Sequence, residues 1–326
     1  MLDFYGKRKI FFTMSLLLIL TGLIFFFVNG GFALDIQFQG GTEIQLEVND
    51  SDFNVEDPND DIIRAEEVAL NTVDRRIMVR HTHSLGSAEG DGRMDFLVIG
   101  VATGEEMLSD SEQRDLVSEL RDEFNIKEDA QMDVNSVSTS ISRELRSKGI
   151  LAVILASILM LLYIWIRFNI MSGLFAGLTA VVALIHDAAI MLSVYVVFGI
   201  PLNETFIAAV LTILGYSMND TIVIYDRIRE NSKASRKDTV EGLVNKSINQ
   251  SLRRSINTSI TTLACVTTVF IFASINGISS LQEFSFPLII GLASGTYSSI
   301  FIASPLWVNW NKAHQRKKAS QKPSNA

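Results

Sequence analysis

Six long apolar runs constrain the fold of this chain more than any other feature of its sequence. Each run is long enough to cross a bilayer as an α-helix, which needs about 20 residues at a rise of about 1.5 Å each. The runs therefore predict a multi-pass α-helical membrane protein with six transmembrane helices. They extend over Ile10–Val28, Gly149–Ile166, Ile170–Val197, Thr205–Tyr225, Ile256–Ile275 and Phe284–Val308.

Charge is distributed unevenly around these runs. Residues 30–147 hold 27 Asp and Glu against 10 Lys and Arg, although the formal net charge of all 326 residues is only −8. Lys and Arg gather in alternate flanks and are absent from the connections 198–204 and 276–283. By the positive-inside rule, both termini are expected to be cytoplasmic, with the acidic segment outside the plasma membrane. No small-residue cleavage site follows the first run, which favours an anchor over a signal peptide.

The chain divides into four parts on this basis. Residues 1–29 are the N-terminus and first helix, and residues 30–147 form an acidic domain that is not expected to bind nucleic acid. Helices 2–6 occupy 148–309, and 310–326 is a basic tail. Within the loop 227–254, apolar residues at helical spacing predict a helix along the cytoplasmic membrane surface, with a solvated linker helix as the alternative.

Alternating and helical patterns predict an α/β fold for the acidic domain. Strands are expected where apolar residues alternate, and helices where they recur every three or four residues. The pattern predicts strands at 42–48, 94–102 and 131–139 and helices at 60–78 and 104–124. This β-α-β-α-β order indicates two layers.

No motif for enzymatic chemistry is visible. The sequence lacks the GxxxxGK[ST], HExxH and GxSxG patterns. His81 and His83 lie close together but have no third metal ligand nearby in the sequence. We therefore expect no enzymatic activity, no cofactor and no metal site.

Acidic residues inside the apolar runs are the candidate functional groups. Asp187 follows His186 in the middle of the third run, and Asp220 follows Asn219 in the fourth. A carboxyl group in hydrocarbon must be protonated, paired or hydrated, so its charge depends on conditions. We expect Asp220 to alternate between a neutral state and an ionised state that pairs with Arg254.

Two features of the helices could serve packing alone. Arg253 and Arg254, at the start of the fifth run, could simply anchor the helix end, and the hydroxyl face of Ser255, Thr258, Ser259 and Thr262 could only permit close approach. Glycines four residues apart also let helices approach closely in lipid. These are Gly173 with Gly177 and Gly291 with Gly295.

Five blocks in order along the chain carry a family resemblance. They are LDIQFQGGTEIQLEV at 34–48, VALIHD at 182–187, FIAAVLTILGYSMNDTIVIYDRIREN at 206–231, SINQSLRRSINTSITT at 247–262 and FSFPLIIGLASGTYSSIFIASPL at 284–306. Together they resemble the SecF family, the smaller component of the SecD–SecF complex of protein export and a relative of the resistance-nodulation-division transporters. The signature residues in the first block are Asp35, Gly40, Gly41 and Thr42.

The resemblance implies a transport role with defined partners. A SecF-like subunit would act with SecD beside the SecY/SecE/SecG channel and use the proton motive force to assist late translocation of unfolded polypeptides. Asp220 would carry the proton and Arg254 would be its partner, assisted by Asn219, Asp187 and His186. Sodium could replace the proton at the same carboxylate.

The resemblance also bears on the acidic domain. It implies a ferredoxin-like domain with one more strand than the pattern predicts, which could lie in 49–57 or 76–84. The segment VSTSISREL at 137–145 departs from the glycine-proline element usual in the family. One alternative function is a half-transporter that exports small molecules or lipids, and another is a tethered sensor.

Overall fold

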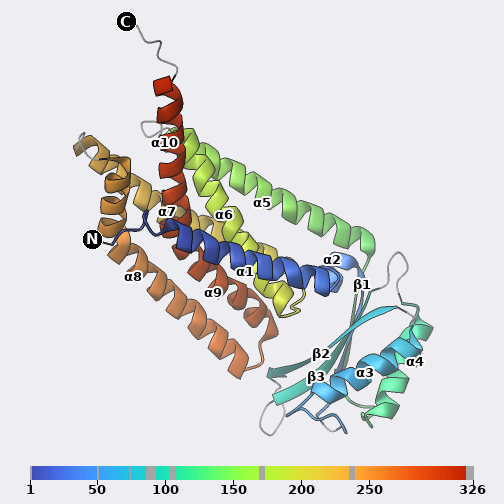
Figure 1. Ribbon diagram of the computed structural model, residues 1–326. Helices are drawn as coiled ribbons and strands as arrows, with labels where there is room; N and C mark the ends of the chain where they lie inside the picture. Colours follow the sequence, from blue (N-terminus) through green and yellow to red (C-terminus); the bar gives the residue numbers. More distant parts are fainter. Residues whose placement is uncertain are drawn as a thin grey trace, which may run out of the picture.

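The computed structural model shows an elongated helix bundle with the acidic domain at one end and both termini at the other (Figure 1). We name these the domain end and the tail end. The structure describes residues 2–49, 51–73, 75–85, 93–102, 108–168, 173–234 and 239–320. The membrane-length helices are α1 (Arg8–Val28), α5 (Thr139–Arg167), α6 (Gly173–Val197), α7 (Glu204–Ala234), α8 (Val240–Ile275) and α9 (Ser279–Ser298), which continues through the π-helical segment η2 (Ser299–Ala303) into α10 (Ser304–Ser320).

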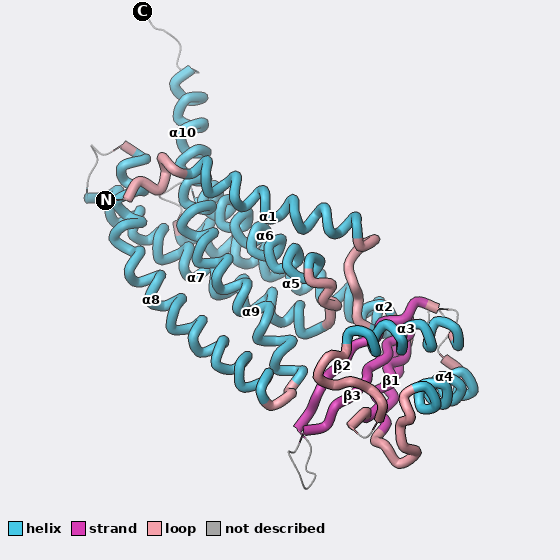
Figure 2. The backbone as a smooth tube through the Cα atoms, turned by 60° about the horizontal axis from the view of Figure 1, so that its bottom comes forward, coloured by secondary structure: helices cyan, strands magenta, loops and turns pink. Residues whose placement is uncertain are grey.

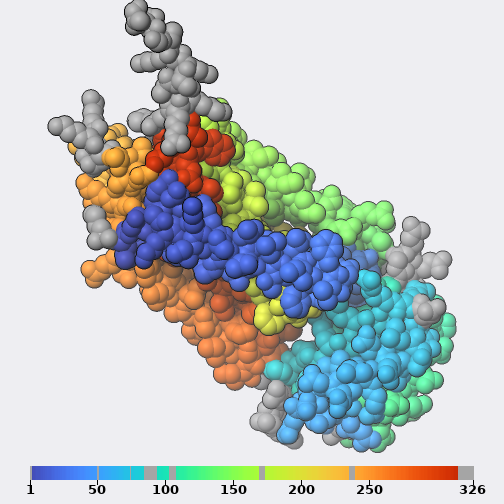
Figure 3. All heavy atoms as spheres, in the orientation of Figure 1, coloured from blue at the N-terminus to red at the C-terminus, as the bar shows by residue number. Residues whose placement is uncertain are grey.

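Six candidate spans within these residues confirm the prediction of a multi-pass membrane protein. Helices α6, α7 and α9 form the centre, where they bury small and apolar side chains against one another. Helices α1, α5 and α8 instead expose rows of large apolar side chains, such as Leu17, Leu159 and Ile260. Figure 3 shows α1 in blue along the outside of the bundle. These outer faces suit lipid or a partner helix.

The amphipathic segment before the fifth span is the first part of α8. Its apolar residues Val244 and Ile248 are fully buried in the core cluster of the bundle, so they do not lie on a membrane surface. Asn231 of α7 donates hydrogen bonds to Ser247 and Gln250 at 2.8 Å each, which joins the two helices at the tail end. The prediction of a surface helix was therefore wrong, because α7 and α8 extend together beyond the length of a membrane span.

The acidic domain consists of a four-stranded antiparallel sheet covered on one face by two helices (Figure 2). Its core contains apolar residues from alternate positions of the central strands, among them Ile44, Leu46, Leu97 and Ile99. The strands are β1 (Gly41–Glu47), β2 (Arg76–Leu85), β3 (Arg93–Ala102) and β4 (Met132–Val137) in the order β2-β3-β1-β4, and the helices are α3 (Asn59–Thr72) and α4 (Asp110–Glu123).

Strand β2 was missing from the pattern-based prediction. The helix expected to reach residue 78 ends at Thr72, since the backbone of Val73 is extended, and Ile77 pairs with Val101 in the sheet. Tertiary pairing thus decides the structure of a stretch whose local pattern also fits a helix. The resulting order is β-α-β-β-α-β, the same as in ferredoxin-like domains.

Several boundaries also differ from the sequence patterns. Helix α5 begins at Thr139, ten residues before the apolar run, and Ser138 caps it. Helix α4 begins at Asp110 with a capping box between Ser109 and Glu112, and the earlier part of the predicted helix, 103–107, lies outside the described residues. The start of the third run at 170–172 and the last six residues of the tail also lie outside them.

Candidate functional site

Both intramembrane carboxyl groups are buried where α6, α7, α8 and α9 meet. Asp187 of α6 is 1% exposed and Asp220 of α7 is 2% exposed. An unpaired buried carboxylate is costly, so its hydrogen-bond partners determine which state the protein can hold. The two acids differ sharply in this respect.

Asp187 is surrounded by hydroxyl donors from two other helices. Ser294 Oγ of α9 donates to Oδ1 at 2.7 Å, and Ser217 Oγ of α7 and Ser298 Oγ of α9 donate to Oδ2 at 2.7 and 2.8 Å. His186 Nδ1 lies 3.2 Å from Oδ1. A carboxylate that accepts several hydrogen bonds has the partners an ionised group needs away from water. Asp187 therefore joins α6, α7 and α9 through one fixed acceptor.

Asp220 has a much sparser environment. Among the described residues, its hydrogen bond comes from Ser259 Oγ of α8, 3.4 Å from Oδ2. Ser259 is itself held by α9, because Thr296 Oγ1 donates to its hydroxyl at 2.6 Å. An ionised Asp220 lacks the donors that Asp187 has. A change in its protonation would consequently disturb contacts that reach α8 and α9.

His186 leaves one ring nitrogen unused. Its Nε2 is buried with no hydrogen-bond partner among the described residues, and its ring stacks on that of Tyr297 with centroids 5.9 Å apart. The opposite nitrogen, Nδ1, faces Asp187. His186 is thus placed beside the first acid.

Arg254 and Asn219 are not brought to the acids in this structure. Both side chains are exposed, and the predicted ion pair between Asp220 and Arg254 is absent from the part of the chain that the structure describes. The reason is helical phase: Ser255 and Ser259 face the core, and Arg254 lies about 100° around α8 from Ser255. Ser259 holds the position expected of the arginine.

The hydroxyl face of α8 is divided accordingly. Ser255 and Ser259 are buried, whereas Thr258 is exposed and Thr262 accepts a hydrogen bond from Tyr216 OH at 3.3 Å. The sequence patterns did not predict that the hydroxyl groups of Ser294 and Ser298 bind Asp187. Their signal was the spacing of four between Ser294 and Ser298 inside an apolar run.

The paired glycines lie at close helix contacts. A Cβ atom on Gly295 would come within 2.8 Å of Ser217 Cβ, and one on Gly291 within 2.5 Å of Ile213 Cγ1, both residues of α7. Gly173 and Gly177 pack similarly against the backbone of α5. Gly291 and Gly295 therefore set α9 directly against α7 beside the acids.

The block at residues 35–42 forms the connection between α1 and the acidic domain. Asp35 caps the short helix α2 (Ile36–Gln39) by accepting from Gln37 N at 3.1 Å, and burial raises the pKa of its carboxyl group above the usual range. Gly40 has φ +82°, a conformation that favours glycine, and Gly41 packs on the backbone of Val101. Thr42 Oγ1 lies 3.0 Å from Ser136 Oγ. These residues turn the chain tightly into β1.

Comparison with known proteins agrees with the sequence resemblance. The family model described as protein export membrane protein SecD/SecF, C-terminal, matches residues 118–313. The protein translocase subunit SecF of Petrotoga mobilis is 37% identical over 98% of this chain and 99% of its own length. The SecF of Alicyclobacillus acidocaldarius is also 37% identical, over 97% of this chain and 94% of its own. The chain belongs to the SecF family.

This chain also matches part of a longer relative. The crystal structure of SecDF from Thermus thermophilus superposes with a TM-score of 0.73 at 30% identity, covering 95% of this chain and 39% of that one. The family model includes both acids and the serines around them, but it excludes β1 to β3 of the acidic domain. The buried polar site therefore lies in the matched region.

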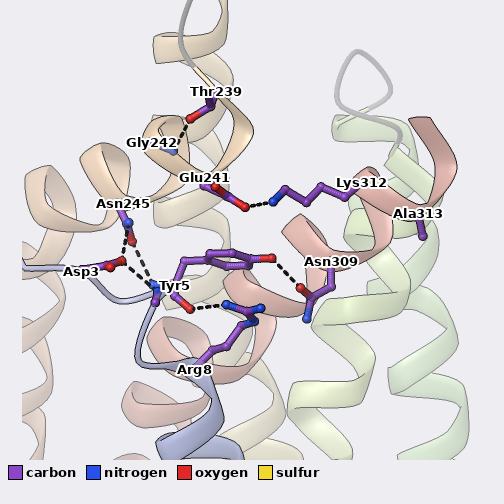
Figure 4. A pocket seen from close by; sticks show the side chains of 11 residues that line it. Asp3, Tyr5, Arg8, Thr239, Glu241, Gly242, Asn245, Asn309, Lys312 and Ala313 are labelled. Atoms are coloured by element: carbon purple, nitrogen blue, oxygen red, sulfur yellow. Dashed lines mark hydrogen bonds and ion pairs between the residues drawn. The ribbon is translucent and has the colours of Figure 1, made fainter. Parts of the chain in front are cut away.

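One cavity in this SecF-family chain lies away from the acids. It has a volume of about 680 Å³ and opens at the tail end, between the N-terminal segment, the start of α8 and α10 (Figure 4). Tyr5 OH donates to Asn309 Oδ1 at 2.8 Å, and Lys312 pairs with Glu241. Polar groups around this cavity bind one another. These contacts hold the N-terminal segment against α8 and α10.

Proposed function

We propose that this chain is a SecF-like accessory subunit of the Sec translocation machinery, which acts with SecD and draws on the proton motive force to assist late translocation and release of exported polypeptides. Its role is transport and not enzymatic catalysis. Membership of the SecF family supports the assignment to translocation. The unequal environments of Asp187 and Asp220 support the proton coupling.

The single observation that carries the coupling is the position of Asp220. It is buried among three helices and, among the described residues, accepts one long hydrogen bond, from Ser259, while neighbouring Asp187 is well supplied with donors. A proton that crosses the membrane releases about 2.3 kcal/mol per 100 mV. That energy can bias two packing arrangements of α7, α8 and α9 if they differ in the charge of Asp220.

Arg254 takes part in the second arrangement under this proposal. In the structure it lies on the exposed side of α8, one residue from buried Ser255. A rotation of α8 about its axis would bring the guanidinium toward α7 and exchange the Ser259 contact for an ion pair. Asn219, also exposed and adjacent to Asp220, would meet the same rearranged surface.

Sidedness and partners belong to the proposed function as well. Basic flanks support a cytoplasmic location for both termini and a location outside the plasma membrane for the acidic domain. The Bacillus subtilis relative is a SecDF, of which this chain covers 39%. A SecD partner would pack on the exposed apolar faces of the outer helices. The SecY/SecE/SecG channel and the unfolded polypeptide complete the assembly.

A translocation assay with substituted Asp220 tests this function. The complex with SecD and the channel is reconstituted in vesicles, and clearance of a precursor protein is measured with and without an imposed proton gradient. Asp220→Asn should retain assembly and lose the response to the gradient, whereas Glu204→Gln, the same carboxyl-to-amide change at an exposed position at the start of α7, should keep the response. An undiminished response in Asp220→Asn would reject the role of this carboxyl group.

The coupling ion is tested in the same vesicles. Replacement of sodium by potassium at constant pH should leave the response unchanged if protons are carried. A response that disappears without sodium would identify sodium as the coupling ion instead. Copurification in mild detergent tests the partners, with SecD and SecY as the expected ones.

A further inference from the structure

Arg80 of β2 connects the acidic domain to the helix bundle. Its guanidinium lies 2.9 Å from Glu43 Oε2 on β1 and 3.6 Å from Glu283 Oε1 on α9. Asp35 Oδ2, at the cap of α2, is 3.9 Å away. Two of these carboxylates belong to the domain side of the junction and the third to a membrane helix. Arg80 therefore stays attached to its own domain while it reaches α9.

The position of Glu283 is well defined. Asn203 Nδ2, just before α7, donates to Glu283 Oε2 at 2.6 Å, which leaves Oε1 for Arg80. About a third of each of the two charged side chains is exposed. A partly buried pair with a third hydrogen-bonded partner holds its geometry better than a free surface pair.

Helix α9 leads from this contact to both buried acids. Ser294 and Ser298 donate to Asp187, and Thr296 reaches Asp220 through Ser259. Ser294 lies eleven positions after Glu283, which is about 16.5 Å along a helix. One helix thus carries contacts at the domain end and at the acids.

Pro287 lies inside α9 between these two sets of contacts. Proline has no N–H, so the carbonyl of Glu283, four residues earlier, has no helical hydrogen bond from this position. Such a position is where a helix bends. Beyond it, Gly291 and Gly295 leave no room for side chains against α7, so this part of α9 can shift only between discrete packings.

We propose that the Arg80–Glu283 ion pair is the contact through which α9 transmits a change at Asp220 to the acidic domain. This inference rests on the proposed function, in which Asp220 changes its charge. A shift of α9 at Thr296 moves Glu283 at the other side of Pro287. Arg80, anchored to Glu43, then moves with β2 or loses its partner on α9. Arg80 and Glu283 are positioning residues, since neither touches Asp220.

A distance measurement tests the transmission directly. In a Cys265→Ser background, spin labels are placed at exposed Ser118 on α4 and exposed Ile275 at the domain end of α8. The full chain in its SecD complex is compared with its Asp220→Asn variant in vesicles. The distance distribution should shift with the Asn substitution, and Arg80→Ala should abolish that shift. No shift in the first comparison, or the same shift with Arg80→Ala, would overturn the proposal.

Gradient-driven translocation provides the second test. Glu283→Gln keeps a hydrogen bond from Asn203 but removes the charge, and it should lower the response to the gradient by about two- to thirty-fold, the range of known coupling substitutions. Glu283→Asp should restore most of it. The matched control is Arg75→Ala, which breaks an ion pair with Glu112 at 3.2 Å inside the acidic domain and should have no effect.

The outcomes separate the two proposals. If the wild-type response does not depend on Asp220, the proposed function fails. If it does depend on Asp220, but Glu283→Gln behaves like Arg75→Ala, only the transmission through Arg80 is wrong. Equal losses in Glu283→Gln and Glu283→Asp would indicate a packing role instead of an ion pair and would also contradict the inference.

Discussion

Ser294→Ala tests the claim that Asp187 is a structural acceptor shared by three helices. The substitution removes the hydroxyl that donates to Asp187 Oδ1 at 2.7 Å and leaves the donors on Oδ2 in place. A hydrogen bond to a charged group contributes about 1.5–3 kcal/mol. Hydrogen bonds between membrane helices average only about 0.6 kcal/mol, because the unfolded chain in the membrane finds other partners. With its acceptor buried, we expect Ser294→Ala to cost about 1.5 kcal/mol.

Ser285→Ala is the matched control for this experiment. Ser285 lies on the same helix and is also buried, but its hydroxyl donates to carbonyls of its own helix. The free energy of unfolding of each variant is measured by denaturant titration in mild detergent micelles. Ser294→Ala together with Ser298→Ala should cost more than the sum of the single changes, since Ser217 is then the one hydroxyl donor to Asp187 left among the described residues. Equal losses in Ser294→Ala and Ser285→Ala would refute the shared acceptor.

Two further predictions concern packing and pH. Gly295→Val should lower the unfolding temperature strongly, because the valine side chain would meet Ser217. Gly215→Val is the control, since its side chain would face open space and should lower the unfolding temperature far less. Similar decreases in both variants would contradict the close contact. Burial raises the pKa of Asp35, so the folded chain binds this proton more tightly than the unfolded chain and stability falls as the pH rises above about 4. Asp35→Asn should weaken the decrease of stability with pH, measured by thermal unfolding between pH 4 and 7. An unchanged pH dependence would show that other groups cause it.

Much of the membrane part follows from the sequence because its signals are local. A run of about 20 apolar residues is enough to indicate a transmembrane helix, and an acidic residue within such a run can be recognised from the sequence alone. Asp187 and Asp220 could thus be found without a structure. Their different environments could not, since Ser217 and Ser259 lie on other helices and hydroxyl residues are common in membrane helices.

The errors have a common physical origin. The pairing of Arg254 with Asp220 stays a prediction, because in this structure the phase of α8 directs Ser259 inward. The helix predicted at 60–78 extended three residues into strand β2, because a short amphipathic stretch satisfies both patterns, and the pairing of β2 with β3 decides between them. Val244 was placed on a lipid surface because its helix is amphipathic, although protein covers that face. In each instance a distant part of the chain determines the outcome.

The π-helical turn Ser299–Ala303 has a consequence for the sixth span as a whole. A wider turn accommodates an additional residue per revolution, so the angular positions of all later side chains are offset from those of an uninterrupted helix. Ser294 and Ser298 can therefore face one set of neighbours while Trp307 and Val308 remain inside the tail end. Deletion of a single residue here would reset this offset and turn one half of the span outward without altering its composition.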